Sequence, residues 1–280
     1  MGLTRLGFSL NPYNDAARDA LARGMSWCRA RDISTWDSPA DDVERITREC
    51  PGSDLVCVLG GDGTFLRTAA SIGDSGVPAL GVNLGRVGFL AKVETGDLER
   101  VLDQVASGDY AVEERLRISA TLVRSNGTIE THPCLNEVVV ARGPRVRMIQ
   151  VEVEVSGSHL ATYVADGVVV ATPTGSTAYS FSAGGAVLDP RLRNMIITPV
   201  AGYLSPLHSV VAGETHVVRL MLREAHDGAI VSVDGQTDLP MQTGDRVEVR
   251  ALPIPLRLVE PKGGAEFYDL LRTKASLLPY

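Results

Sequence analysis

Apolar runs and amphipathic segments alternate through the first third of the chain. The run at 55–59 is apolar without interruption, which is typical of a strand buried on both faces. In the segment 97–107, apolar side chains recur at spacings of three and four, which predicts one buried helical face. Strands are expected at 6–10, 55–59 and 77–82, and helices at 15–30, 65–72 and 97–107. This alternation predicts βαβ units and a parallel sheet.

After Gly108 the hydrophobic period changes from helical to two. Val151, Val153 and Val155 alternate with polar residues, which predicts a half-buried antiparallel strand. Further strands are expected at 116–123, 128–132, 160–164, 215–222, 229–233, 246–250 and 256–259. The fold class is therefore an α/β N-terminal domain with a parallel sheet plus a mostly antiparallel β C-terminal domain.

The change of period places a domain boundary close to residue 110. We expect an α/β domain over 1–110, a β-rich domain over 111–260 and a C-terminal tail over 261–280. The tail is expected to be helical around 267–274 and to pack back onto the first domain.

Composition and charge narrow the class of protein. The 280 residues are 44% hydrophobic and 22% charged, which excludes disorder for most of the chain. A net charge of −7 argues against a nucleic-acid partner. The four cysteines are widely spaced, so neither a zinc framework nor a disulfide scaffold is expected. No signal peptide and no run of membrane-spanning length is apparent, so a cytoplasmic protein without a membrane partner is expected.

A glycine-rich loop follows the continuous apolar strand and opens a helix. Its residues Gly60, Gly61, Gly63 and Thr64 are candidate phosphate ligands, because glycines allow close approach and helix N-termini present free N–H groups. The loop matches neither a Walker A motif nor the dinucleotide-binding fingerprint. Asp62 would repel a phosphate unless it takes a proton from a hydroxyl or faces a metal ion. The alternative is a tight turn in which Asp62 caps the helix.

Two further segments have compositions that suit a nucleotide. The run 166–185 is rich in Thr, Ser and Gly, and its uncharged hydrogen-bonding groups suit a base and a ribose, with Tyr179 available to stack. Asn136 and Glu137 precede an apolar strand, where the carboxylate could accept hydrogen bonds from a diol. The alternatives are a capped Ser/Thr-rich loop and an ordinary strand start.

Taken together, these motifs resemble the NAD kinase family. The resemblance rests on the segments 60–64, 83–90, 136–137, 166–185 and 233–236, in this order, and covers about residues 55–240. The GGDG segment is shared with lipid kinases and phosphofructokinases, whereas the run Thr-Pro-Thr-Gly-Ser-Thr-Ala-Tyr at 172–179 is specific. The resemblance implies phosphorylation of the 2′-hydroxyl of the adenosine ribose of NAD, with ATP or another phosphoryl donor, to give NADP.

The resemblance also implies roles for individual residues. Asp62 matches the general base, Gly63 lies beside it at the substrate, and Asn136 and Glu137 match the pair that holds the nucleotide. The other implied substrate contacts are Arg147, which meets phosphate, and Asp166, Thr177, Ala178, Tyr179, Ser182, Ala201 and Gln236. A divalent cation, Mg²⁺ or another ion, would be carried on the nucleotide phosphates, with few dedicated protein ligands. A homodimer or homotetramer is expected, because the family's NAD site borrows residues from a neighbour.

The chain departs from the family pattern at two places. The segment 202–206 reads Gly-Tyr-Leu-Ser-Pro instead of a Pro-His-Ser-Leu-like stretch, and the loop 11–15 lacks a glycine-rich phosphate segment. Two alternative functions remain at this point: a lipid or sugar kinase that shares the GGDG loop, and a non-catalytic nucleotide sensor.

Overall fold

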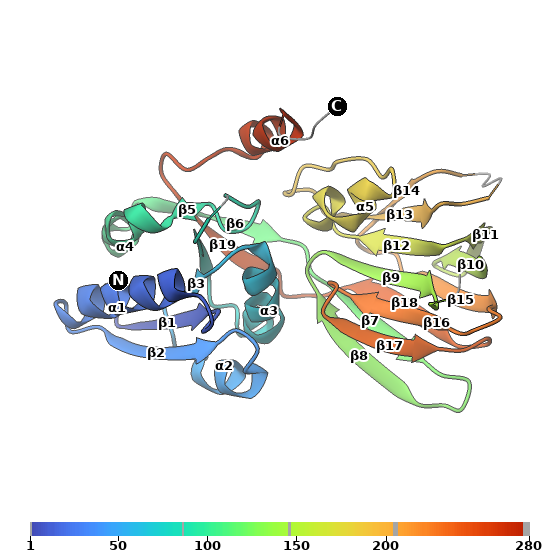
Figure 1. Ribbon diagram of the computed structural model, residues 1–280, viewed down its shortest axis with the longest axis horizontal. Helices are drawn as coiled ribbons and strands as arrows, with labels where there is room; N and C mark the ends of the chain where they lie inside the picture. Colours follow the sequence, from blue (N-terminus) through green and yellow to red (C-terminus); the bar gives the residue numbers. More distant parts are fainter. Residues whose placement is uncertain (1, 86, 145–146, 204–206, 277–280) are drawn as a thin grey trace. The chain divides into compact units, whose positions relative to one another are not determined.

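The computed structural model describes residues 2–85, 87–144, 147–203 and 207–276 and divides the chain into two compact units. The first contains residues 1–114 and 254–280, and the second contains residues 115–253. The first unit contains one sheet and the second contains two (Figure 1). Each unit has its own hydrophobic core.

The first unit is built on a mainly parallel sheet in the order β2-β1-β3-β4-β19-β6, with β5 paired to β4. Its strands are β1 (Arg5–Leu10), β2 (Ser34–Pro39), β3 (Leu55–Leu59), β4 (Ala79–Asn83), β5 (Val93–Glu94), β6 (Tyr110–Arg115) and β19 (Leu256–Pro261). Its helices are α1 (Asp15–Arg29), α2 (Val43–Glu49), α3 (Asp62–Ile72), α4 (Leu98–Ser107) and α6 (Phe267–Ser276), with short 3₁₀ turns at Gly73–Ser75 and Thr95–Asp97.

Helices cover both faces of this sheet, which explains why its central strands are almost completely buried. Leu6 and Phe8 of β1 pack in one core with residues of α1 and α4. On the opposite face, the Ser9 hydroxyl lies 2.6 Å from that of Thr68 on α3. The five residues of β3 and of β4 are all buried, as expected for parallel strands covered on both sides.

The second unit is a sandwich of two six-stranded antiparallel sheets, in the orders β11-β10-β15-β18-β7-β8 and β14-β13-β12-β9-β16-β17. Its strands are β7 (Ile118–Val123), β8 (Ile129–Cys134), β9 (Glu137–Arg142), β10 (Ile149–Val155), β11 (Ser158–Ala165), β12 (Gly167–Ala171), β13 (Asn194–Val200), β14 (Val210–Gly213), β15 (Val218–Glu224), β16 (Ala229–Val233), β17 (Thr237–Met241) and β18 (Arg246–Ala251). A 3₁₀ turn at Gly175–Thr177 and the short helix α5 (Tyr179–Ser182) follow β12. The inward-facing side chains of the two sheets form one core.

The predicted fold class is confirmed, with differences at individual elements. The expectations did not include β2, whose sequence STWDSP is mostly polar because it is an edge strand and needs few apolar residues. The strand expected at 256–259 was placed in the second domain, whereas β19 pairs in parallel with β4 of the first sheet. Its apolar pattern does not specify which sheet it joins.

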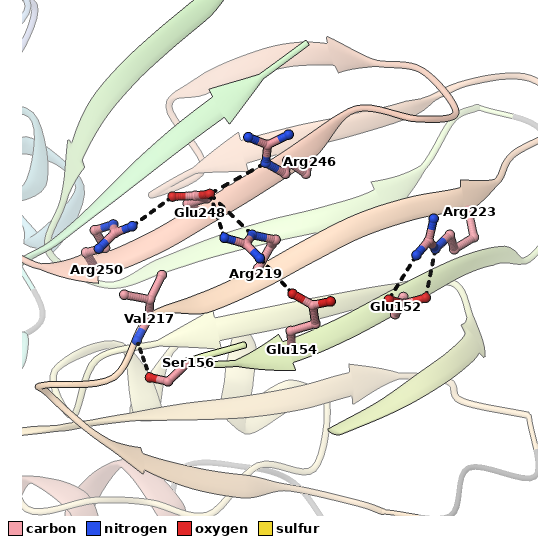
Figure 2. Close-up of polar contacts among 9 residues, drawn as sticks. All are labelled: Glu152, Glu154, Ser156, Val217, Arg219, Arg223, Arg246, Glu248 and Arg250. Carbon is pink, nitrogen blue, oxygen red and sulfur yellow. Dashed lines mark hydrogen bonds and ion pairs between the residues drawn. The ribbon is translucent and has the colours of Figure 1, made fainter. Parts of the chain in front are cut away.

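The outer face of the sheet containing β10, β15 and β18 has a network of ion pairs (Figure 2). Arg219 contacts Glu154 at 2.7 Å and Glu248 at 3.1 Å. Glu248 also accepts a hydrogen bond from Arg250 at 3.0 Å and forms an ion pair with Arg246 at 3.5 Å. The hydrogen bond from Arg250, followed by that from Arg219, lowers the pKa of the Glu248 carboxyl. Alternate residues of β15 face the core, so period two separates the charges from the apolar side.

None of the helices within the described ranges is both long enough and apolar enough to cross a membrane.

We predict that Glu248→Gln lowers the free energy of unfolding at pH 7 by about 1 kcal/mol, because three arginines lose their shared carboxylate. The folded pKa is below the unfolded one, so this contribution exists above the unfolded pKa and is lost as pH falls. Urea unfolding of both proteins at pH 7 and at about pH 3 should therefore show a difference that shrinks in acid. Glu114→Gln, a change at an exposed carboxyl group of β6, is the control. A pH-independent difference would contradict the prediction.

Candidate functional site

The glycine-rich loop lies at the carboxyl end of β3, where ligands bind in α/β sheets. The Gly60 N–H donates to Val82 at the end of β4, and Gly61 is the N-cap residue of α3. The helix begins at Asp62, three residues earlier than the pattern predicted, so Asp62 and Gly63 stand in its first turn. Thr64 is buried, and its N–H donates to the carbonyl of Gly61.

The carboxylate of Asp62 accepts hydrogen bonds from three consecutive backbone N–H groups. Phe89 donates to Oδ2 at 2.9 Å, and Leu90 and Ala91 donate to Oδ1 at 3.1 Å each. Gly88 lies so close that a Cβ there would be 1.9 Å from Oδ1, so this residue must be glycine. Asp62 therefore does not cap α3 through its side chain; it binds a second loop, which includes most of the predicted 83–90 motif.

This arrangement determines what the carboxylate can still do. A carboxylate has about four acceptor positions, two on each oxygen. Oδ1 uses both of its positions on Leu90 and Ala91, whereas Oδ2 uses one on Phe89. One acceptor position on Oδ2 is left for a proton or a hydroxyl group.

In the second unit, the carboxylate of Asp234 likewise binds consecutive backbone N–H groups, here those of the segment that contains Asn136 and Glu137. Its carboxylate accepts the N–H groups of Leu135 and Asn136 at 2.8 Å each and that of Glu137 at 3.0 Å. The thiol of Cys134 donates to it as well, at 2.9 Å. The sequence pattern includes Asp234 in the segment 233–236 but does not mark it as a site residue. Its Asp-Gly pair between two strands, with left-handed φ values of 52° and 63°, is the signal of the turn that places it.

The Thr/Ser/Gly run packs against the same segment. The Thr172 N–H donates to the carbonyl of Asn136 at 2.8 Å, and its hydroxyl donates to the carbonyl of Leu135 at 2.6 Å. Of the predicted contacts, Thr177 lies in the 3₁₀ turn, Ala178 precedes α5, and Tyr179 and Ser182 are exposed on α5. Gln236 is exposed two residues beyond Asp234. The structure therefore brings Asn136, Glu137, Thr172 and Tyr179 into one cluster.

Glu137 is a buried carboxyl group without a positive partner among the described residues that surround it. Burial, followed by the charge of Asp234, raises its pKa to about 8, against a hydrogen bond from the Tyr179 backbone that lowers it. Within the described part of the chain, its Oε2 and the Oδ1 of Asn136 are buried without a hydrogen-bond partner. Because buried polar atoms are nearly always paired, these two atoms are where a ligand's hydrogen-bonding groups are expected to bind.

Arg147 and Asp166 lie at the opposite end of β12 from this cluster. Glu137 is paired with Ala171 at one end of the strand, and Ala141 is paired with Gly167 at the other. Five residues of strand span roughly 16 Å. Asp166 accepts a 2.7 Å hydrogen bond from Arg142, and it lines a cavity of about 610 Å³ with Arg147 and His226. Within one chain, Arg147 and Asp166 are thus not brought to Asn136 and Glu137.

Ala201 lines a separate cavity of about 470 Å³ with Ala183, Gly184 and His208, just beyond α5. It has a left-handed φ of 47°, which is uncommon for alanine. Residue 86 of the predicted motif and residues 204–206 of the departing segment lie outside the described residues.

Comparison with protein-family models decides the relationship. The model of the ATP-NAD kinase N-terminal domain matches residues 11–110, and that of the ATP-NAD kinase C-terminal domain matches residues 135–260. The chain belongs to the NAD kinase family. The NAD kinase of Heliobacterium modesticaldum is 38% identical over 279 residues, covering 96% of this chain and 97% of the relative. That of Symbiobacterium thermophilum is 43% identical over 223 residues, covering 80% and 78%.

Two solved structures share the fold. Yeast NADH kinase, complexed with NADH, has a TM-score of 0.85 at 24% identity and covers 99% of this chain and 88% of its own. An NAD kinase from Archaeoglobus fulgidus, in complex with ATP, has a TM-score of 0.80 at 24% identity and covers 98% and 100%.

We predict that Glu137 makes stability fall with rising pH. Its folded pKa is raised to about 8, so the folded protein binds the proton more tightly than the unfolded chain does. Stability is then highest below the unfolded pKa and is lost between about pH 4.5 and pH 8. In urea unfolding, wild type relative to Glu137→Gln should lose roughly 2–5 kcal/mol across this range. A constant difference between the two proteins would show that Glu137 is ionised in the folded state.

Proposed function

We propose that this NAD kinase family member transfers the γ-phosphoryl group of ATP to the 2′-hydroxyl of the adenosine ribose of NAD, forming NADP. The observation that carries the proposal is the carboxylate of Asp62, which three N–H groups orient and which keeps one acceptor position on Oδ2. The relatives named above are NAD kinases, and the neighbouring structures contain NADH or ATP.

Asp62 acts as the general base in this proposal. A ribose hydroxyl is a weak nucleophile while it is protonated, and Oδ2 can accept its proton as the bond to phosphorus forms. The start of α3 supplies the backbone N–H groups of a helix N-terminus, which favour a nearby phosphate. The proton moves to Asp62, and the leaving nucleoside diphosphate takes the electron pair of the broken P–O bond.

Asn136 and Glu137 hold the nucleotide by its hydroxyl groups. The unpartnered Oδ1 of Asn136 is an acceptor, and the Glu137 carboxyl, whose pKa is raised to about 8, can donate as well as accept, so the pair suits two ribose hydroxyls. The exposed ring of Tyr179 and the hydroxyls of the 172–182 run supply stacking and further hydrogen bonds. This uncharged surface favours a nucleotide acceptor over a lipid or a sugar phosphate, and the presence of Asp62 favours an enzyme over a nucleotide sensor.

A divalent ion fits this loop as part of the nucleotide. Asp62 is the one carboxylate in the segment 60–64, and a single acceptor position remains on it, so phosphate oxygens would be the main ligands. When bound, Mg²⁺ would neutralise part of the phosphate charge.

The decisive experiment is incubation of the protein with NAD, ATP and Mg²⁺, followed by detection of NADP with an NADP-specific dehydrogenase. We expect NADP to accumulate in proportion to enzyme and time. Parallel reactions with polyphosphate or with NADH define the donor and the acceptor. NADP absent from every donor reaction, with bound NAD detected by calorimetry, would instead identify a nucleotide sensor.

We predict that Asp62→Asn lowers kcat by roughly 10²–10⁴, because an amide cannot accept the proton. It should also lower the free energy of unfolding by about 1–3 kcal/mol. In one orientation of the amide its NH₂ group faces the N–H of Phe89, and in the other it faces those of Leu90 and Ala91, so at least one hydrogen bond is lost. Steady-state kinetics and urea unfolding measure the two effects separately.

Asp41→Asn, the same change at an exposed position, is the control and should alter neither quantity. A folded Asp62→Asn protein that keeps kcat within about threefold of wild type would exclude Asp62 as the base and leave it the purely structural role of holding the 88–91 loop.

We further propose a homo-oligomer in which a second copy supplies Arg147 and Asp166 to the nucleotide. Support comes from their place at the opposite end of β12 from Asn136 and Glu137.

Light scattering should give at least twice the mass of one chain. Mixing two inactive variants, Glu137→Ala and Asp166→Ala, should restore up to about a quarter of wild-type activity in a dimer, because half of the dimers are mixed and each of these has one intact site. A monomer, or a mixture without activity, would contradict this assembly.

A further inference from the structure

The turn that holds Asp62 is itself held at three places within the first unit. Residues 88–91 form a turn closed by a hydrogen bond from the Gly88 N–H to the carbonyl of Ala91 at 3.0 Å. Strand β4 lies directly behind it, because a Cβ at Gly81 would be 2.4 Å from the carbonyl oxygen of Leu90 and 2.7 Å from Cα of Ala91. This contact fixes the two donors to Oδ1.

A buried ion pair anchors the next residue. Lys92 Nζ lies 2.6 Å from Glu260 Oε1 on β19, and both side chains are largely buried. Strand β19 therefore secures the end of the turn, and the chain continues from β19 into α6.

The remaining donor, Phe89, is contacted by α6. The ring centroids of Phe89 and Phe267 are 5.7 Å apart, and Lys274 Nζ lies 5.2 Å from the centroid of the Phe89 ring. Phe267 and Lys274 are seven residues apart and lie on one face of the helix, together with the buried Leu270. Helix α6 thus contacts the side chain of the residue whose N–H binds Oδ2 of Asp62.

We propose that Phe267, assisted by Lys274, is a positioning residue for the proposed reaction: by holding the Phe89 ring, it orients the Phe89 N–H and so Oδ2 of Asp62. This inference rests on the proposed role of Asp62. Oδ1 is fixed by two donors that β4 supports, whereas Phe89 is the donor to Oδ2, the oxygen with the open acceptor position. The residue before Phe89 is glycine, which has no side chain to pack. The Phe89 side chain is therefore the group through which other residues can hold this end of the turn.

The effect is expected in kcat rather than in substrate binding. The Phe267 ring packs against the Phe89 ring of the turn, and Phe267 is not one of the proposed nucleotide contacts, so its loss should displace Oδ2 without removing a binding group. Small displacements of a catalytic group reduce rates by one to two orders of magnitude. Phe267→Ala should therefore lower kcat about tenfold and leave KM for NAD and for ATP within about threefold.

The decisive test repeats this change in the Asp62→Asn background. If Phe267 acts through Asp62, Phe267→Ala should change the residual kcat of Asp62→Asn by less than about twofold. An equal tenfold loss in both backgrounds, or no loss in the wild-type background, would overturn the proposal. Phe267→Tyr, which keeps the ring, should restore kcat, and Arg272→Ala, on the exposed side of α6, is the matched control that should change nothing.

Hydrogen exchange gives a readout that does not depend on activity. The amides of Phe89, Leu90 and Ala91 should exchange slowly in the wild type, and that of Phe89 should exchange about tenfold faster or more in Phe267→Ala, while β3 amides stay protected. Unchanged exchange at Phe89 would overturn the positioning role. A wild type that forms no NADP would refute the proposed function but leave this result interpretable.

Lys274→Met provides a second variant should Phe267→Ala fail to fold. It removes the cation above the Phe89 ring and keeps an apolar chain of similar length. We expect a smaller decrease of kcat, about twofold to fivefold, again absent in the Asp62→Asn background. Equal decreases in both backgrounds would count against the proposal.

Discussion

An aspartate that accepts three consecutive backbone N–H groups is the interaction on which both candidate sites depend. Asp62 gathers the N–H groups of residues 89–91, and Asp234 gathers those of residues 135–137. Consecutive N–H groups converge only where the chain turns sharply, and they then form a concave site for an anion. In both units the anion belongs to the protein itself, so the turn and the carboxylate hold each other in place.

The same device has different consequences in the two units because the surroundings differ. At Asp62, Oδ2 keeps an open acceptor position, which leaves the carboxylate able to react. At Asp234, the bound segment carries a second carboxyl, Glu137, into a buried place beside that negative charge. Burial and the neighbouring charge raise the pKa of Glu137 to about 8, so the group is largely protonated at neutral pH. One aspartate thus keeps an open acceptor position, and the other holds a neutral, hydrogen-bonding carboxyl group in place.

The cores explain how such polar turns are kept rigid. Strand β3 is buried on both faces and ends at the loop that begins α3, so the loop starts from a fixed point. In the second unit, β9 and β16 pair directly, which brings the start of β9 and the end of β16 together and places Asp234 against residues 135–137. The hydrogen bonds between these turns are then formed between segments that the apolar core has already ordered.

Local pattern was sufficient for a large part of this protein. The apolar run before GGDGT, the specific run at 172–179 and the change of hydrophobic period at Gly108 predicted the fold class, the family and the candidate residues, because each signal lies within a few neighbouring positions. Tertiary structure alone decided that Asp62 binds residues 27 to 29 positions away, that Asp234 binds residues nearly 100 positions away, and that β19 returns to the first sheet. It also decided that Arg147 and Asp166 stand apart from Asn136 and Glu137. The physical reason is that a backbone N–H is the same at every residue except proline, so the sequence carries no mark of which distant carboxylate it will bind.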